Sequence, residues 1–302
     1  MLKRLLVPLD GTRLAETVLP VAASLAEKAG ARITLLHVLE RAAPAKVHGE
    51  THLTSAEEAQ QYLERIARES FPPSVPVDWH VHHRPIADVA HSVADHADEL
   101  EPDLIVMARH GHRHFMQFFF GSIPQQVIRQ TPTPVLLVQP KADHAVPASF
   151  QHVFVPLDGQ PEHEVALPLA AEIARLYEAT IRLMMVVPTR GALAGSTAAV
   201  GQLLPAATTE VLDLAEQSGV EYLAHHLEGL QAEGGHAVAT IARGDPLDVL
   251  QHTLQENGAD LVAMGTHAAA GTQAFWAGSI GQKLLDRIPA SFLLVPVSAT
   301  VR

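Results

Sequence analysis

The stretch Leu5-Leu6-Val7-Pro8-Leu9-Asp10-Gly11 returns 148 positions later as Val153-Phe154-Val155-Pro156-Leu157-Asp158-Gly159. Each copy begins as a short, almost wholly apolar run, which is typical of a strand that helices cover on both faces. An aspartate and a glycine follow, as expected where the chain turns. A repeat of this length indicates a duplicated domain rather than a solenoid of short units.

Four further segments recur in the same order: Ile33 to Val38 as Ile181 to Val186, Asp103 to Met107 as Asp260 to Met264, Gly121-Ser122 as Gly278-Ser279, and Pro134 to Val138 as Ser291 to Val295. Apolar patterning predicts strands in the first half at 5–9, 33–39, 77–81, 103–108 and 134–138. Helical spacing predicts helices between them at about 15–29, 55–69, 86–99 and 122–130. In the second half we expect strands near 152–157, 181–187, 236–242, 260–265 and 291–296.

Strands that alternate with helices specify an α/β fold with a parallel sheet. We therefore predict two tandem, doubly wound, five-stranded parallel-sheet domains of Rossmann-like type. The domains should span 1–142 and 150–302, because the segment from about 140 to 150 has the proline and charged residues of a linker.

Composition limits the classes of function. A formal net charge of −12 argues against a nucleic-acid partner, which needs a basic surface. The absence of cysteine excludes thiol catalysis, disulfides and cysteine-ligated metals. No apolar run approaches the roughly 18 residues of a membrane span, and no signal peptide is evident, so we expect a cytoplasmic protein without a membrane partner.

In an open parallel sheet, ligands bind beyond the carboxyl ends of the strands. Asp10 and Asp158 end the first strand of each half. The loops 108–122 and 265–279 follow the fourth strand, and they read Ala108-Arg109-His110-Gly111, nine residues, Gly121-Ser122, and Gly265-Thr266-His267-Ala268, nine residues, Gly278-Ser279. Small residues allow backbone amides to approach a phosphate, and a Gly-Ser that opens a helix offers amides and a hydroxyl to it.

These motifs, in this order and twice over, resemble the universal stress protein family in its tandem form. The resemblance covers nearly the whole chain and implies an adenine nucleotide alpha hydrolase-like fold. In family members that bind ATP, it implies that the aspartate after strand one contacts the ribose region. The end of strand two lies by the adenine, and the Gly-Ser loop holds the phosphates.

The resemblance carries over to positions in each half, with ATP or a related adenine nucleotide as ligand and Mg²⁺ as an ion that could accompany it. The candidates in the first half are Pro8, Asp10, Val38, Ala108, Arg109, His110, Gly111, Arg113, Gly121, Ser122 and Ile123. Those in the second half are Pro156, Asp158, Val186, Gly265, Thr266, His267, Ala268, Gly271, Gly278, Ser279 and Ile280.

Each half departs from the family's glycine pattern once, with Ala108 in the first loop and Ala268 in the second. Alanine adds a methyl group and disfavours positive φ, so its effect depends on the local backbone. We expect a nucleotide in at least one half. The alternative is that both aspartates are turn or N-cap residues and that the Gly-Ser pairs are helix caps.

The chain has 19 histidines, with His80, His82 and His83 near one strand and His110, His112 and His114 in the first loop. Zinc is conceivable there, but no convergent ligand set is evident, so we predict no metal site. No nucleophile or acid–base set is recognisable either, so we predict no catalytic residue. Slow ATP hydrolysis stays an alternative.

These features favour a stress-response regulator in which a nucleotide orders a loop and so biases a surface for an unknown regulatory protein partner. The alternatives are a nucleotide-free interaction or scaffold protein, and a carrier of a small molecule or a metal. The resemblance implies that the halves form an intramolecular pseudo-dimer through their last strands, Pro134 to Val138 and Ser291 to Val295. Self-association into a homodimer stays open.

Overall fold

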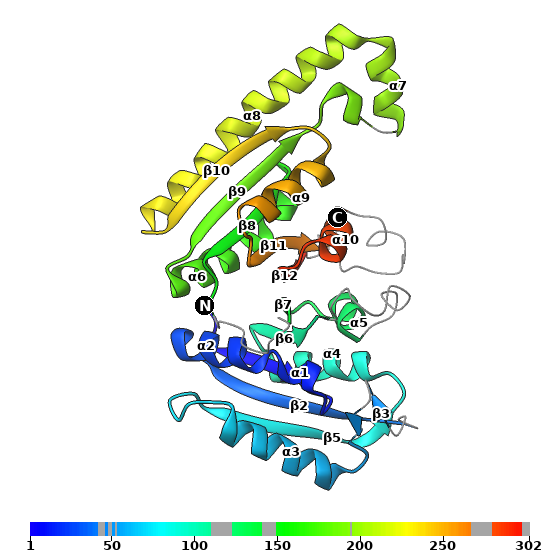
Figure 1. Ribbon diagram of the computed structural model, residues 1–302, viewed down its shortest axis with the longest axis vertical. Coiled ribbons are helices and arrows are strands. Elements are labelled where there is room, and N and C mark those ends of the chain that lie inside the picture. The colour runs from blue at the N-terminus through cyan, green and yellow to red at the C-terminus, as the bar shows by residue number, and fades with distance from the viewer. Residues whose placement is uncertain are drawn as a thin grey trace. The chain divides into compact units, whose positions relative to one another are not determined.

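The computed structural model describes residues 1–41, 46–47, 50–51, 53–109, 123–140, 149–193, 195–266 and 280–297 (Figure 1). The described chain divides into two compact units. Unit 1 holds the first half of the chain together with β12 (Ser291–Pro296), and unit 2 holds Phe150–Thr266 together with α10 (Ile280–Arg287). The domain limits 1–142 and 150–302 stay a prediction.

Unit 1 is built on a mostly parallel sheet. Its strands lie in the order β5-β2-β1-β6-β7-β12. They are β1 (Arg4–Pro8), β2 (Arg32–Glu40), β5 (Val77–Ile86), β6 (Leu104–Ala108), β7 (Val135–Val138) and β12. Only β12 runs antiparallel to its described neighbour, with Leu293 opposite Leu136 of β7. The expected pairing of the last strands of the two halves is therefore confirmed.

Helices cover both faces of this sheet. They are α1 (Arg13–Glu16), α2 (Leu19–Ala29), α3 (Ala56–Glu69), α4 (Val89–Leu100) and α5 (Ile123–Gln130). Two short strands, β3 (Lys46–Val47) and β4 (Glu50–Thr51), pair with each other.

The single helix predicted at 15–29 is wrong, because the structure has α1 and α2 there. Pro20, in the first turn of α2, has no N–H to donate to the carbonyl four residues earlier. The Thr17 hydroxyl also donates to the Leu14 carbonyl at 2.6 Å. The chain therefore starts a new helix where proline is best tolerated.

Unit 2 repeats this scheme with four parallel strands in the order β10-β9-β8-β11. They are β8 (His152–Leu157), β9 (Thr180–Val187), β10 (His236–Arg243) and β11 (Leu261–Thr266). Its other elements are η1 (Pro161–Ala166), α6 (Leu167–Tyr177), η2 (Arg190–Ala192), α7 (Gly195–Leu203), α8 (Pro205–Ala232), α9 (Pro246–Glu256) and α10.

The main difference between the halves lies between their second and third strands. Helix α3 of unit 1 has 14 residues, whereas α8 of unit 2 has 28 and α7 precedes it (Figure 1). Pro205 occupies the first turn of α8, where a fixed φ favours helix initiation. Sequence patterning identified the strands on either side but not this long helix.

Equivalent aspartates hold the amino ends of the two sheets. Asp103 Oδ2 accepts hydrogen bonds from the Lys3 and Arg4 amides at 2.7 and 2.9 Å. Asp260 accepts from the Gln151 amide at 2.7 Å and from the His152 amide. Burial raises the pKa of Asp260, while these amides oppose the shift. The inner strands β1, β6, β8 and β11 are almost wholly buried, as expected of parallel strands that helices cover, and the parallel sheets confirm the α/β, Rossmann-like fold in both halves.

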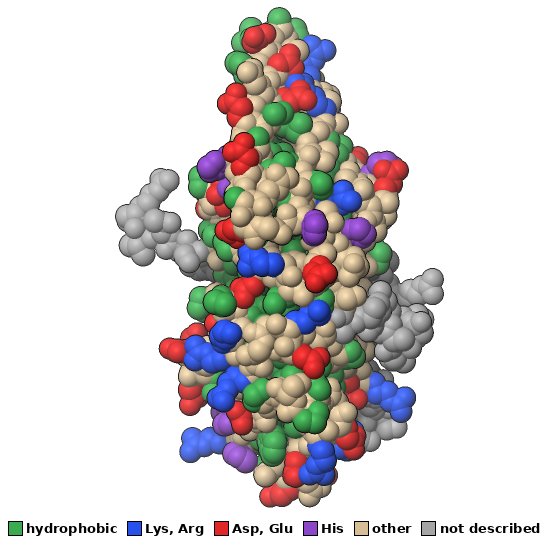
Figure 2. Space-filling view, turned by 90° about the vertical axis from the view of Figure 1, so that its left-hand side faces the viewer, with side chains coloured by type: hydrophobic (Ala, Val, Ile, Leu, Met, Phe, Trp, Pro, Cys, Tyr) green, Lys and Arg blue, Asp and Glu red, His purple; other side chains and the backbone are tan. Residues whose placement is uncertain are grey.

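Two observations bear on the expected absence of certain partners. No helix among the described residues is long and apolar enough to cross a membrane. On the face shown in Figure 2, blue Lys and Arg side chains are interspersed with red Asp and Glu side chains, and the described residues there form no continuous basic stripe.

Candidate functional site

The carboxyl ends of β1, β2 and β6 meet at one edge of the unit 1 sheet. Pro8 at the end of β1 lies opposite Leu36 of β2, and the Leu9 amide donates to the Leu36 carbonyl at 2.8 Å. Strand β6 runs parallel to β1 on its other side. The topology therefore places Pro8, Asp10, Val38 and Ala108 at the same edge, as the sequence predicted.

Asp10 shapes the turn that leaves β1. Its Oδ1 accepts hydrogen bonds from the Thr12 amide at 2.9 Å and from the Thr12 hydroxyl at 2.7 Å. Thr12 in turn caps α1 by accepting from the Ala15 amide at 3.2 Å. Gly11 has φ +87°, and a Cβ there would lie 2.9 Å from Leu53, so the turn requires glycine. The Oδ2 atom of Asp10 has no hydrogen-bond partner within the described residues.

Asp158 makes the equivalent turn in unit 2 but uses both of its oxygens. Oδ1 accepts from the Gln160 amide at 3.0 Å, and Gly159 has φ +80°. Oδ2 lies 2.7 Å from Nδ1 of His163, which belongs to η1. The carboxylate that the family resemblance assigns to the ribose is therefore already paired inside unit 2.

The same histidine closes the end of β11. A Cβ on Gly265 would lie 3.3 Å from both Cα and the carbonyl oxygen of His163. Unit 1 has Ala108 at this position, at the end of β6, where α1 rather than a 3-10 helix follows the first turn. Unit 1 thus has alanine at this position where α1 follows the turn, and unit 2 has glycine where η1 follows it.

A tyrosine near a glutamate supports this region in each unit, a feature that sequence reasoning missed. The Tyr222 hydroxyl of α8 donates to Glu164 Oε1 at 2.9 Å, and His226 Nε2 lies 3.4 Å from the same oxygen. Burial, and then the hydrogen bond to Glu164, raise the pKa of Tyr222. The long helix α8 therefore holds η1 against the strand ends.

Unit 1 has the corresponding pair in Tyr62 and Glu16. Burial, and then the charge of Glu16, raise the pKa of Tyr62. However, the Tyr62 hydroxyl has no hydrogen-bond partner of good geometry among the described residues, and Glu16 lies 3.8 Å from Arg65. The sequence does contain a signal for these pairs, since a tyrosine follows the glutamate in each half. The spacing is 46 residues after Glu16 and 58 after Glu164, so aligning the repeats by position does not reveal it.

The side chains that follow the fourth strands point into the protein. Arg109 is only 2% exposed, and its guanidinium carbon lies 5.2 Å from the centroid of the Phe292 ring of β12. Thr266, its counterpart, is also buried. At these two positions only the backbone is therefore available to a ligand at the strand ends, because the side chains are buried.

The remaining candidates divide into two sets. Val38 is buried at the end of β2, Val186 is half-buried near the end of β9, and Ile123 and Ile280 open α5 and α10 with exposed side chains. Ten candidates lie outside the described residues: His110, Gly111, Arg113, Gly121, Ser122, His267, Ala268, Gly271, Gly278 and Ser279.

Two of the histidines that the sequence analysis singled out, His80 and His82, form a cluster in unit 1 with a third, His96. The ring centroids of His80 and His82 on β5 lie 4.9 and 5.1 Å from that of His96 on α4. Desolvation and the neighbouring His96 lower the pKa of both His80 and His82. In the part of the chain that the structure describes, no three His, Asp or Glu side chains are arranged to hold a metal ion.

Comparisons with known proteins agree with this architecture. A universal stress protein of Synechocystis is 30% identical over 138 residues, which cover 46% of this chain and 86% of that protein. The crystal structure of a universal stress protein from Archaeoglobus fulgidus matches with a TM-score of 0.67 at 16% identity, over 97% of this chain and 96% of that one. A protein of Pseudomonas aeruginosa assigned to the same family matches with a TM-score of 0.68 at 16% identity, over 98% and 93%.

The family model settles the assignment. The model of the universal stress protein family matches twice, at residues 1–139 and 149–296, and so covers nearly the whole chain. The two matches fall on the two sequence repeats. The chain belongs to the universal stress protein family, in a form with two tandem family domains.

Proposed function

We propose that this protein is a stress-response regulator that binds ATP or a related adenine nucleotide in at least one of its units. Family membership supports the stress-response role. The arrangement of the strand ends supports the ligand, because Asp10 and the ends of β2 and β6 lie along one edge of a parallel sheet.

The observation that carries the proposal is the difference between the two aspartates. Oδ2 of Asp10 is not engaged within the described residues, whereas Oδ2 of Asp158 is 2.7 Å from His163. A carboxylate oxygen without a partner can accept hydrogen bonds from the ribose hydroxyls, and such charge-assisted bonds are the stronger ones. We therefore assign the nucleotide to unit 1.

The rest of unit 1 complements this choice. The family resemblance assigns the phosphates to the loop after Ala108 and to the Gly121-Ser122 pair, and Mg²⁺ would neutralise part of the phosphate charge. The chain's own net charge of −12 makes such neutralisation useful. Binding would then bias a surface of unit 1 toward or away from a protein partner.

The test is calorimetric titration of the full chain with ATP and MgCl2, with matched variants in the two units. Asp10→Asn keeps an oxygen for the Thr12 turn but removes the charge, and we expect affinity to fall about tenfold. Asp158→Asn should leave affinity within about twofold. Circular dichroism would verify that both variants are folded.

Two results would contradict the proposal. Weaker binding in Asp158→Asn alone would move the nucleotide to unit 2. No heat and no thermal shift with the unmodified protein would leave the nucleotide-free interaction protein as the better description, with the strand ends acting as structural turns.

A further inference from the structure

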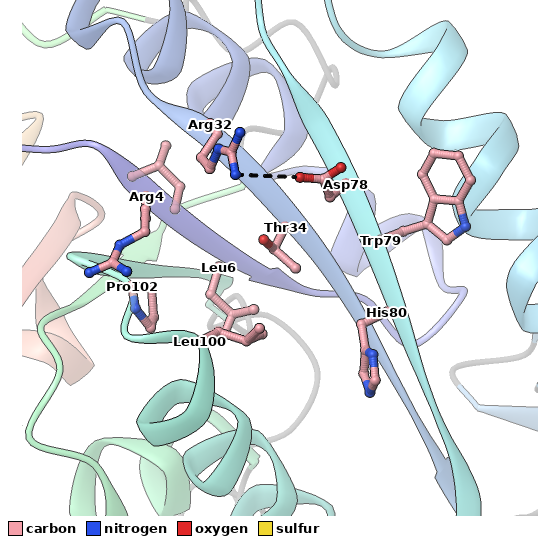
Figure 3. Close-up of a pocket in the computed structure, with 10 residues that line it drawn as sticks. Arg4, Leu6, Arg32, Thr34, Asp78, Trp79, His80, Leu100 and Pro102 are labelled. Atoms are coloured by element: carbon pink, nitrogen blue, oxygen red, sulfur yellow. Dashed lines mark ion pairs between the residues drawn. The ribbon is translucent and has the colours of Figure 1, made fainter.

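A groove lies at the opposite end of the unit 1 strands from Asp10. It is a groove of about 360 Å³ at the amino ends of β1, β2 and β5, beside the carboxyl end of α4 (Figure 3). Its lining comes entirely from unit 1. This volume is at the lower end of the range for small-molecule sites, about 300–1,000 Å³.

The groove has an apolar floor and a polar rim. Leu6 of β1, Leu100 of α4 and Pro102 form the floor, and Figure 3 shows them on one side of the space. The rim carries charged and polar groups, which are Arg4, Arg32, Thr34, Asp78 and His80. The indole of Trp79, by contrast, points away from the groove (Figure 3). Such a division suits a ligand with one apolar part and one polar part.

The residues of unit 2 that match the groove of unit 1 are larger. Leu6 lies opposite Thr34 across β1 and β2, and their counterparts Phe154 and Arg182 lie opposite each other across β8 and β9. In unit 2 the Arg182 guanidinium carbon is 5.9 Å from the centroid of the Phe154 ring. Leucine and threonine are much smaller than phenylalanine and arginine, so unit 2 has larger side chains at the two positions that line the groove in unit 1.

The charged groups on the rim are weakly engaged with one another. Arg32 lies 4.0 Å from Asp78, and Arg4 lies 3.5 Å from Glu101. All four side chains are largely exposed, and ion pairs of this kind contribute little to stability. The two guanidinium groups can therefore turn toward a ligand at low cost, and guanidinium matches a carboxylate with two parallel hydrogen bonds.

We propose that this groove binds a small amphipathic carboxylate, with its acid group between Arg4 and Arg32 and its apolar body against the partly exposed Leu100 of α4. Thr34 and Asp78 can then accept hydrogen bonds from any hydroxyl or amine on the ligand. The volume suits an acid of one or two rings or a short chain. The site is independent of the proposed nucleotide site.

The experiment is calorimetric titration of the full chain with 2-naphthoate, and with the uncharged 2-naphthamide as a probe of the apolar contribution alone. We expect naphthoate to bind with a one-to-one ratio and the amide to bind at least about tenfold more weakly. Equal affinity for the two probes would overturn the role of the arginines.

Three variants place the site. Arg4→Gln/Arg32→Gln removes the charge from exposed positions and should weaken naphthoate about tenfold without affecting the amide. Thr34→Met fills the groove without adding charge and should weaken both probes about tenfold. Arg182→Gln, at the matched position of unit 2, should change neither.

The folded state of each variant is verified by its unchanged thermal transition, and ATP binding is measured in parallel. Naphthoate binding that persists in both unit 1 variants, or no detectable binding to the unmodified protein, would overturn the proposal. Weaker ATP binding in Asp10→Asn with unchanged naphthoate binding would show that the two sites are independent.

Discussion

The two units share a scaffold and differ in what occupies its two ends. At the carboxyl end, the second oxygen of Asp10 is open within the described residues, while that of Asp158 pairs with His163. At the amino end, Leu6 and Thr34 line a groove in unit 1, while the matching positions of unit 2 hold the larger Phe154 and Arg182, whose guanidinium carbon lies 5.9 Å from the ring centroid. In both places unit 2 supplies from its own chain a group that unit 1 lacks. The duplicated units thus share their strands, and they differ in the side chains at the two ends of those strands.

The long helix α8 accounts for part of this difference. It carries Tyr222 and His226 over Glu164 of η1, and so holds His163 beside Asp158. The shorter α3 places Tyr62 near Glu16, but without a hydrogen bond among the described residues. A change in one connecting helix therefore goes with a different set of side-chain contacts at the carboxyl end of the sheet.

The largest expected effect tests whether each unit is stabilised by its own core. Leu25 in α2 and Ile173 in α6 are matched, fully buried positions. Leu25→Ala and Ile173→Ala should each cost about 2–5 kcal/mol, since each leaves a cavity. Hydrogen exchange measured by peptide should show protection lost in β1 and β2 for the first variant, and in β8 and β9 for the second. Equal loss in both units for either variant would contradict separate stabilisation.

The tyrosines give a smaller effect that distinguishes the units. Tyr222→Phe removes a hydroxyl that donates to Glu164 at 2.9 Å, so it should destabilise unit 2 by about 1 kcal/mol. Tyr62→Phe removes a buried hydroxyl that lies near Glu16 but has no hydrogen-bond partner of good geometry among the described residues, so it should cost clearly less than Tyr222→Phe. Urea denaturation of both variants measures the difference. Equal destabilisation would mean that the two Tyr–Glu pairs are equivalent.

Two helix ends exchange roles between the units. The residue after α2 is Gly30 with φ +61°, but the residue after α6 is Glu178 with φ +55°. Conversely, Glu101 after α4 has φ +45°, while Gly258 beyond α9 has φ +60°. Glutamate is strained in this region and glycine is not, so Glu101→Gly and Glu178→Gly should each stabilise the protein by about 0.5–1 kcal/mol.

Alanine at the same two positions provides the control for these cap substitutions. Alanine has a Cβ, so it should give no comparable gain in the midpoint of thermal unfolding. A gain with alanine equal to that with glycine would point to the removed charge rather than to the backbone.

The sequence predicted the strands well because buried parallel strands are nearly continuous apolar runs, and these occur twice in the chain. The turn residues Asp10 and Asp158 were predictable for the same reason. The pairing of Asp158 with His163 was not, because nothing in a five-residue spacing tells whether an imidazole turns toward the carboxylate. The groove was also beyond prediction, since it depends on the volumes of side chains such as Leu6 and Thr34 that meet only across two strands.

The smallest expected effect concerns pH and the histidine cluster, which unit 2 lacks. By strand register, Thr240 and Ala242 of β10 correspond to His80 and His82 of β5. Desolvation and His96 lower the pKa of both histidines below the ordinary value of 6.5, so the unfolded chain binds protons more readily than the folded one. Their contribution to stability is therefore complete above pH 6.5 and is lost as pH falls from there through the lowered values.

The matching substitution is His80→Thr/His82→Ala, which gives unit 1 the residues of unit 2. We expect the unmodified protein to lose stability between pH 7.5 and pH 5 more steeply than this variant, because the variant no longer carries the two groups that resist protonation on folding. Urea unfolding at several pH values measures the two slopes. His80 is exposed and His82 is half-buried, so the difference should be small, and it should be confined to unit 1 in hydrogen exchange. A steeper slope in the variant would mean that the acidic neighbours, Glu99 beside His80 and Asp95 beside His82, outweigh burial and His96.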